Sequence, residues 1–347
     1  MMETIQNIIK HIASLVPPDR KIKIMNVCGS HEHTISYSGI RSLMPGNLEL
    51  IPGPGCPVCV CPESDIINAI ELSKRDDVIL VTYGDMLRVP TKNGTIRAKG
   101  GNYRIITSPL EALNIANSNS DKKIVFFSIG FETTTAPAAA MLETGVPDNL
   151  YILSSHRLTP MIMEVLVKDA EIGIDGFIAP GHVSAITGSD SWNVFSEKYG
   201  IPTVVAGFEP DNLLSGILDV LRQLAEGKAV TTNVYSAVVK RKGNVRAQEI
   251  IYKYFKVSDV NWRGIGNVPL SGLEMKAGYA HRDAKKVFDL KEIKEEKIPG
   301  CLCGNIILGK SYPSECKLFK KVCTPKNPLG PCMVSFEGSC NIWYKTN

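Results

Sequence analysis

Short apolar runs alternate with helical patterns along the first two-thirds of the chain. Most of these runs are unbroken and rich in β-branched or aromatic residues, as is typical of parallel strands buried on both faces. We expect six strands, at Ile22–Val27, Val78–Tyr83, Ile124–Ile129, Leu150–Ser154, Gly176–Ala179 and Thr203–Gly207. Alternation of such strands with helices predicts α/β domains built on parallel sheets.

Three helices between or after these strands have clear local causes. A capping box with proline at the first helical position begins at Ser108. Thr159 and the proline after it open a second helix in the same way. Residues 211–225 place leucine and isoleucine on one stripe and are followed by glycine, which predicts an amphipathic helix with a defined end.

The length of 347 residues exceeds what one ordinary core supports, so we expect several domains. A polar stretch near residue 120 separates two strand-rich halves, and the alternation weakens near 235–245. These boundaries predict a first α/β domain at 1–120, a second at 121–240 and a C-terminal region at 241–347.

The C-terminal region changes character twice. Residues 282–297 are dense in charge, which predicts a solvated helix or a linker. From 299 to 347 the chain is rich in cysteine, proline and glycine and has no clear periodicity. A segment that buries little apolar surface needs another source of order, and a metal centre supplies one.

Composition narrows the function classes without identifying one. The net charge is +4 and charged residues make up 21% of the chain, so neither nucleic acid nor a membrane surface is an expected partner. No signal-peptide pattern or membrane-spanning run is present in the sequence, and we expect a cytoplasmic protein. Thiols in that compartment stay reduced unless they bind metal or carry out redox chemistry.

The ten cysteines fall into two groups, four near the N-terminus and six near the C-terminus. The second group consists of Cys301, Cys303, Cys316, Cys323, Cys332 and Cys340. One zinc ion or one [4Fe-4S] cluster takes four thiols, so two are left over. In an extended chain the first two point to the same side, which allows one to ligate while the other stands beside the centre. The spacing lacks the paired C-x2-C of structural zinc sites and favours iron-sulfur, with a zinc site and spare thiols as the alternative.

Residues 304–311 fit the P-loop pattern letter for letter. The phosphate-binding mechanism of that loop needs a buried strand before it and a helix after it. Proline and glycine precede this segment, and Pro313 follows it closely. We therefore expect no nucleotide loop here, and saturable ATP binding lost on changing Lys310 would show otherwise.

The first strand runs directly into Cys28 and His31. Ligands of α/β sheets gather just beyond the carboxyl ends of strands, where this loop falls. His31 is placed to lower the pKa of Cys28 and make it a better ligand or nucleophile. The alternative is a buried free cysteine beside a hydrogen-bonded histidine.

A second loop contains a C-x2-C motif formed by Cys56 and Cys59, in a turn stiffened by proline and opened by glycine. Such a motif indicates a redox pair or half of a metal site. A helix that begins at Glu63 follows, and its N-terminus would favour thiolate and other anions. Cys61 has no evident partner, and we interpret it as structural or incidental.

Two further polar loops follow strands in the second half. One contains Glu132, Thr133 and Thr134, and the other contains His182. Both lie at the sheet edge where ligands bind, so a cleft between the halves would be lined from both sides. Helix capping by the threonines and hydrogen bonding of a buried histidine are the alternative explanations.

Taken together, these motifs resemble the HypD family of hydrogenase maturation factors. The matching segments are, in order, Cys28–His33, Gly53–Cys59, Gly130–Thr134, Pro180–Ser184 and Gly330–Cys340. They span nearly the whole chain, and the C-x2-C loop and the six-cysteine tail are the most specific. The resemblance implies two parallel-sheet α/β domains around a cleft and a small cysteine-rich iron-sulfur domain.

The resemblance also implies roles for the thiols. A [4Fe-4S] cluster would be held by Cys301, Cys316, Cys323 and Cys340. Cys303 and Cys332 would form a redox dithiol beside it, an arrangement similar to ferredoxin-thioredoxin reductase. Cys28 would hold the iron on which the Fe(CN)2CO unit of [NiFe]-hydrogenase is built, shared with the small chaperone HypC. Cys56 and Cys59 would handle cyanide delivered by HypE.

Two other functions are compatible with the residues. A freestanding thiol-disulfide reductase would use the tail to reduce partner proteins, and it would leave Cys28, Cys56 and Cys59 without a shared purpose. A zinc-stabilised binding module would carry out no chemistry. Metal analysis and assays of disulfide reduction distinguish these two from a maturation scaffold.

Overall fold

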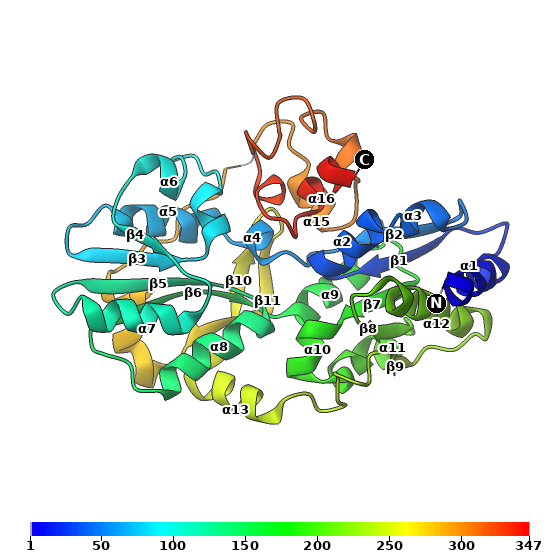
Figure 1. The fold of residues 1–347 in the computed structure, drawn as a ribbon, viewed down its shortest axis with the longest axis horizontal. Coiled ribbons are helices and arrows are strands. Elements are labelled where there is room, and N and C mark those ends of the chain that lie inside the picture. Colours follow the sequence, from blue (N-terminus) through cyan, green and yellow to red (C-terminus); the bar gives the residue numbers. More distant parts are fainter. Residues whose placement is uncertain (1, 297, 347) are drawn as a thin grey trace.

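The chain forms two lobes, each built on one sheet, with the C-terminal tail lying across them (Figure 1). This computed structural model describes residues 2–296 and 298–346. The five-stranded sheet has the order β2 (Leu48–Pro52), β1 (Ile22–Asn26), β7 (Gly176–Pro180), β8 (Thr203–Ala206), β9 (Thr231–Asn233). The six-stranded sheet has the order β10 (Phe255–Trp262), β11 (Gly266–Met275), β6 (Leu150–Arg157), β5 (Lys123–Gly130), β3 (Val78–Thr82), β4 (Tyr103–Ile105).

The six strands expected from apolar runs are confirmed as β1, β3, β5, β6, β7 and β8. All pairs in the five-stranded sheet are parallel. In the six-stranded sheet β3 to β6 pair in parallel, whereas β11 pairs antiparallel with both β6 and β10. The expectation of two purely parallel sheets therefore needs correction, because a hairpin from beyond residue 250 extends the larger sheet.

The sheets also differ from the expected division at residue 120. The five-stranded sheet combines β1 and β2 with β7 to β9, and the six-stranded sheet combines β3 and β4 with β5, β6 and the hairpin. Each sheet thus contains strands from both sides of residue 120. Because the chain crosses between the lobes after β2, β6 and β9, the lobes are not the consecutive units 1–120 and 121–240.

Helices pack on both sheets, and a few short helices occur in the tail. The α-helices are α1 (Met2–Leu15), α2 (Gly29–Tyr37), α3 (Ile40–Leu43), α4 (Pro57–Val60), α5 (Glu63–Ser73), α6 (Ile96–Lys99), α7 (Pro109–Ser118), α8 (Glu132–Glu143), α9 (Thr159–Val167), α10 (Gly181–Thr187), α11 (Asn193–Tyr199), α12 (Pro210–Ala225), α13 (Val245–Tyr254), α14 (Ala284–Val287), α15 (Cys303–Ile307) and α16 (Ser339–Thr346). The 3-10 helices are η1 (Gly84–Arg88), η2 (Ser189–Trp192), η3 (Ala277–Arg282), η4 (Pro313–Glu315) and η5 (Pro331–Met333). Within the described residues, the helices are too short or too polar to cross a bilayer.

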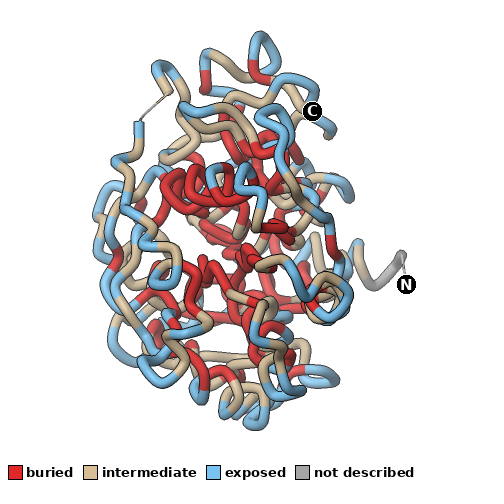
Figure 2. Tube along the Cα trace, turned by 90° about the vertical axis from the view of Figure 1, so that its left-hand side faces the viewer, coloured by how far each residue is buried: buried red, intermediate tan, exposed pale blue. Residues whose placement is uncertain are grey.

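Local signals account for the helices that the sequence predicted. Ser108 caps α7 in a capping box, with Glu111 bonding back to the cap. α12 buries its predicted apolar stripe against β7 and β8, with Leu214, Ile217 and Leu221 almost fully buried. Buried residues gather inside the molecule and exposed residues lie at its surface (Figure 2), and the buried apolar residues form three core clusters within the described residues. The largest core cluster includes side chains of both sheets together with tail cysteines, so the tail packs on the α/β body.

Residues 282–296 of the charged stretch form a strap that contains one short α-helix, α14. Its second half has no regular structure up to residue 296, and residue 297 lies outside the described residues. Side chains of α5 hold the strap: Asn68 donates to the carbonyl of Lys291 at 3.0 Å, and Glu63 accepts from the backbone N–H of Glu296 at 3.2 Å. The strap leads the chain from the six-stranded sheet into the tail.

Candidate functional site

Cys28 lies where β1 ends and α2 begins, at the N-cap position of the helix. The backbone N–H of Gly29 donates to the carbonyl of Gly55 at 3.2 Å, which ties this loop to the C-x2-C loop. A Cβ on Gly55 would lie only 2.4 Å from the Cα of Cys28. Glycine at position 55 therefore allows the two loops to touch.

A small cavity of about 10 Å³ unites thiols that are far apart in the chain. Cys28, Cys56, Cys59 and the tail residues Cys332 and Glu337 all line it. Such a volume holds about one water molecule. The two N-terminal cysteine motifs thus meet at one edge of the five-stranded sheet, and tail residues line the same space.

Cys56 and Cys59 are joined by a disulfide, with their Cα atoms 5.3 Å apart. Cys56 is the N-cap of α4, and Pro57 supplies the first turn of that helix. Both cysteines are buried. The C-x2-C therefore forms a disulfide at the wall of the cavity in this state.

Burial raises the pKa of the Cys28 thiol to about 11, and the nearby carboxyl of Glu337 adds to the rise. Backbone N–H groups of Ser30 and His31 oppose it. The expectation that the His31 imidazole lowers this pKa is wrong, because His31 acts on Cys28 only through its backbone N–H. The thiol is protonated at neutral pH unless a cation displaces the proton.

The imidazole of His31 is turned toward the end of β8. Its Nε2 lies 3.0 Å from the carbonyl oxygen of Gly207 and 3.2 Å from that of Ala206. Burial lowers the pKa of His31 to about 4, so the ring is neutral and Nε2–H donates to these carbonyls. Nδ1 is buried and lacks a partner among the described residues. His31 therefore links α2 to β8.

Phe208 lies between two histidines at this edge of the five-stranded sheet. The His31 ring centroid is 4.9 Å from Phe208, and His182 stacks on Phe208 at 3.9 Å. His182 lies at the start of α10 and is largely exposed. The part of its ring that is covered loses contact with water, and this lowers the pKa of His182. It is not among the described residues that line the Cys28 cavity.

Glu132 is buried at the start of α8, where its carboxyl accepts from the backbone N–H and the hydroxyl of Thr159 at 2.8 and 2.9 Å. Burial raises its pKa to about 7. Thr133 and Thr134 are half-buried in the first turn of α8. None of the three lines the cavities described here. In the described structure, Glu132 connects α8 to α9.

All six tail cysteines line one further cavity: Cys301, Cys303, Cys316, Cys323, Cys332 and Cys340. The thiols of Cys301, Cys303, Cys332 and Cys340 follow one another in hydrogen-bond contact. Within residues 2–296 and 298–346, no three histidine, cysteine or acidic side chains converge as a single metal ion requires. The donor set consists of soft thiols around a shared space, a chemistry that suits an iron-sulfur cluster and a zinc site alike.

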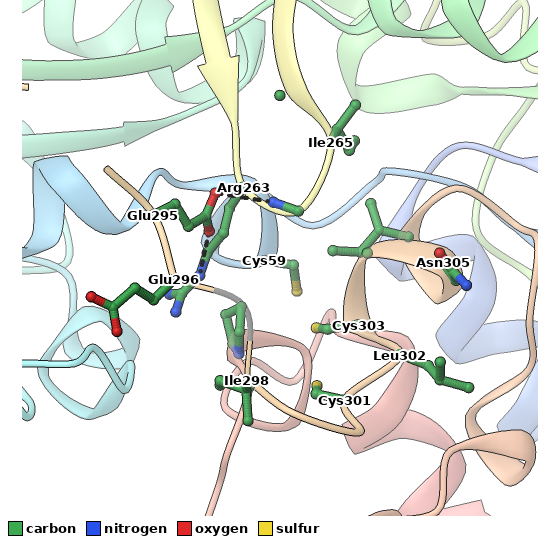
Figure 3. Close-up of a pocket in the computed structure, with 16 residues that line it drawn as sticks. Cys59, Arg263, Ile265, Glu295, Glu296, Ile298, Cys301, Leu302, Cys303 and Asn305 are labelled. Atoms are coloured by element: carbon green, nitrogen blue, oxygen red, sulfur yellow. Dashed lines mark hydrogen bonds and ion pairs between the residues drawn. The ribbon is translucent and has the colours of Figure 1, made fainter. Parts of the chain in front are cut away.

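A larger cavity of about 350 Å³ lies beside the disulfide (Figure 3). Cys59 of α4, Cys301 and Cys303 of the tail, and Arg263 at the tip of the β10–β11 hairpin all line it. Arg263 pairs with Glu295 at 3.3 Å, and its backbone N–H donates to the carbonyl of Val60 at 2.9 Å. Cys59 thus lies on the walls of both cavities.

Three residues of this region carry weaker sequence signals and were not predicted from the sequence. Glu32 and Glu337 both line the Cys28 cavity, and each lies inside a quoted motif, between histidines or between cysteines. Burial raises the pKa of Glu337 to about 7. Their positions next to histidines or cysteines of the motifs could have marked both glutamates as candidate site residues. Arg263 had no such signal, because it lies at the tip of a hairpin that the apolar pattern did not predict.

Two open questions of the sequence are resolved by contacts. Lys310 forms ion pairs with Asp169 at 2.6 Å and Glu171 at 2.7 Å, and α15, rather than a strand, precedes it. The segment therefore matches the P-loop in sequence but lacks the preceding strand that a phosphate-binding loop requires. Cys61 is buried with its sulfur 3.4 Å from the hydroxyl of Ser155, and it does not line the described cavities.

The chain is similar to known proteins along nearly its whole length. The family described as "HypD: Hydrogenase formation hypA family" matches residues 3–347. Hydrogenase maturation factor HypD2 of Bradyrhizobium diazoefficiens is 42% identical, with 95% of this chain and 91% of the relative covered. Hydrogenase maturation factor HypD of Azotobacter vinelandii is 42% identical over 98% of this chain and 93% of its own. The corresponding factor of Cupriavidus necator is 40% identical, covering 99% and 94%. The chain therefore belongs to the HypD family.

Proposed function

We propose that this protein acts in hydrogenase maturation, in the cytoplasm, as the scaffold on which the Fe(CN)2CO unit of [NiFe]-hydrogenase is assembled. The observation that carries the proposal is the cavity shared by Cys28, the Cys56–Cys59 disulfide and Cys332. In this proposal Cys28 holds iron as cargo, because a soft thiolate suits that metal. The enclosing loops limit access of water to the cargo.

The proposal assigns the tail an electron-transfer role. Cys301, Cys316, Cys323 and Cys340 would hold a [4Fe-4S] cluster, which when bound supplies one-electron chemistry. Cys303 and Cys332 would be the dithiol beside it. Two observations support this assignment: the six cysteines share one cavity, and Cys332 also faces the Cys28 cavity.

Two partners complete the proposal. A HypC-type chaperone would share the iron held at Cys28, and a HypE-type donor would deliver cyanide near Cys56 and Cys59. Backbone N–H groups at the start of α2 and α4 lie next to these thiols and are suited to stabilise negative charge on cyanide.

Infrared spectroscopy tests the scaffold directly. The protein is purified anaerobically after co-expression with its maturation partners, as wild type, Cys28→Ala and Cys61→Ala. We expect cyanide and carbonyl stretches in wild type and in Cys61→Ala, and none in Cys28→Ala, with tail iron and acid-labile sulfide present in all three. Diatomic stretches that persist in Cys28→Ala would exclude Cys28 as the iron ligand.

A second function, thiol-disulfide reduction of partner proteins, is favoured by one observation. Cys59, Cys301 and Cys303 line the same 350 Å³ cavity, which is large enough to admit part of a partner. An assay of the full-length chain with an artificial disulfide and a one-electron donor tests it. Catalytic turnover by a protein that shows no diatomic stretches would favour this function. Zinc in place of iron and sulfide would contradict both functions.

A further inference from the structure

The C-terminal helix α16 packs against α2, the helix that begins at Cys28. The indole Nε1–H of Trp343 donates to the carboxylate of Glu32 at 2.8 Å. Glu32 is 1% exposed and lines the Cys28 cavity one helical turn beyond Cys28. The last helix of the tail is therefore bonded directly to the wall of the proposed iron site.

The carboxylate of Glu32 accepts hydrogen bonds from residues of several elements. It accepts from Arg41 at 3.0 Å, from Asn26 of β1 at 3.1 Å and from Ser36 at 3.2 Å. Arg41 also lies over the Trp343 ring, 5.0 Å from its centroid. A buried carboxylate needs such donors, and its position depends on all of them. Removing the indole N–H would take one donor from Oε1 of Glu32, which keeps its bonds from Arg41 and Ser36 but loses its bond to the tail.

The same short helix reaches the six-cysteine cavity. Cys340 lies in the first turn of α16, three residues before Trp343, so the two side chains lie on neighbouring positions of one helix face. Cys340 lines the tail cavity, and its backbone N–H donates to the sulfur of Cys332 at 3.3 Å. Helix α16 thus carries Cys340, which lines the tail cavity, and, one turn later, Trp343, which bonds to Glu32.

The tail also covers Cys28 directly. Glu337 lies against Gly29, where an added Cβ would lie 2.5 Å from the Cβ of Glu337. The remaining space of about 10 Å³ accommodates neither a metal with its ligands nor an alkylating reagent. Cys28 keeps partial exposure, so the segment that joins Cys332 to Cys340 narrows access to this thiol, and entry of a metal with its ligands requires that segment to move.

We propose that Glu32 and Trp343 are positioning residues that hold the tail closed over Cys28, so that order in the six-cysteine cavity controls access to Cys28. The inference rests on the proposed function, because it takes the tail cysteines to hold a metal centre. A centre bound by thiols from distant positions orders a segment with little regular structure. α16 transmits that order to the Cys28 loop through the Trp343–Glu32 hydrogen bond.

The test is the rate at which iodoacetamide alkylates Cys28, measured on its peptide by mass spectrometry at one pH, under anaerobic conditions. The full-length chain is compared with its tail centre reconstituted and after chelation. Trp343→Phe removes the indole donor and keeps a ring beneath Arg41. Trp192→Phe is the matched control, since Trp192 also donates from a buried indole, to Ser184 at 2.8 Å, and lies away from the described site.

In wild type we expect chelation to accelerate Cys28 alkylation about ten-fold, the effect of losing one hydrogen bond to a charged group. Trp343→Phe should show the fast rate even with its centre in place, and Trp192→Phe should behave as wild type. An unchanged slow rate in Trp343→Phe that retains iron and sulfide would overturn the inference. Equal acceleration in both tryptophan variants would overturn it as well.

A second variant keeps the test decisive if Trp343→Phe loses the centre. Glu32→Gln retains an oxygen that can accept from Trp343 but removes the charge that binds Arg41, and it should also alkylate faster. A wild-type rate in Glu32→Gln would contradict the inference. Failure of the proposed function has a different signature, namely no iron and no sulfide in any preparation, including wild type.

Discussion

A thiol that is buried beside a carboxyl group is difficult to ionise, and Cys28 is in that position. Its pKa of about 11 means that metal binding, rather than the free protein, must supply the thiolate. Glu132, a buried carboxyl at the start of α8 in the other lobe, has a raised pKa for the same reason, burial. At the scale of single residues, desolvation dominates both groups.

Glu337→Gln should make Cys28 more reactive. Glu337 has a pKa of about 7, so at pH 8 it is mostly ionised and raises the pKa of Cys28. Removing this charge lowers the Cys28 pKa, and each unit of decrease gives about ten-fold more thiolate. Alkylation of Cys28 at pH 8 should accelerate by about three- to ten-fold, and the difference should shrink below pH 6. Exposed Glu249→Gln is the control, and an equal increase there would contradict the mechanism.

Glu132→Gln should flatten the pH dependence of stability. The folded-state pKa of Glu132 is about 7 against an ordinary value of 4.5, so between these values the folded protein holds a proton that the unfolded chain releases. The free energy of unfolding therefore falls as pH rises from about 4.5 to 7, by at most about 3 kcal/mol. Urea denaturation at pH 5 and pH 8 measures it. If the free energy of unfolding falls equally between pH 5 and pH 8 in the variant and in wild type, Glu132 is not the cause of that fall.

At the scale of elements, close packing of two loops forms the site. The Gly53–Gly55 turn lies against the Cys28 loop because these glycines have no Cβ, and the β10–β11 hairpin reaches α4 through Arg263 and Val60. Neither contact follows from the helix or strand pattern of the elements involved. Both depend on how the ends of β1 and β2, which pair in parallel, meet at one edge.

Gly55→Ala should disturb the site more than an equivalent change nearby. Its Cβ would lie 2.4 Å from the Cα of Cys28, so one loop must move. Overpacking of this kind costs about 1–3 kcal/mol, which a lower midpoint in urea denaturation would reveal. Gly46→Ala is the matched control, because an added Cβ there meets nothing within 4 Å. Equal midpoints for the two variants would contradict the close approach of the loops.

At the scale of the whole molecule, the tail joins the two lobes. Lys310 pairs with Asp169, Arg88 of η1 donates to the carbonyl of Val334 at 3.1 Å, and Trp343 bonds to Glu32. These contacts attach the cysteine-rich segment to α2 of one lobe, to η1 of the other and to the segment that follows α9. The tail has little regular structure of its own, so its order depends on these contacts and on the centre that its thiols are proposed to hold.

Removing metal from the tail should loosen the tail before the lobes. Hydrogen exchange of the full-length chain is measured with the centre reconstituted and after chelation. We expect amides of residues 299–346 to exchange at least about ten-fold faster after chelation, while β5 and β7 stay protected because they are central and buried. Uniform loss of protection across the tail and both sheets would show a single cooperative unit instead.

The local pattern was sufficient for the buried strands and for several helix starts. Unbroken apolar runs become central strands wherever they pair, and the capping box at Ser108 acts within four residues. The pattern was insufficient for the edge strand β2 and for β10 and β11, which are partly exposed. Edge and hairpin strands have one solvated side or edge, so their side chains vary more freely.

The thiols show the same division. By itself the amino-acid sequence determined the six strands formed by unbroken apolar runs and the two groups of cysteines. It also determined that Cys28 directly follows a buried strand. Only the tertiary structure decided which strands share a sheet, that Glu32 and Glu337 enclose Cys28, and that His31 faces β8 instead of the thiol. The physical reason is range: propensity, capping and turn chemistry act over a few residues, whereas sheet order and side-chain direction depend on packing between segments hundreds of residues apart.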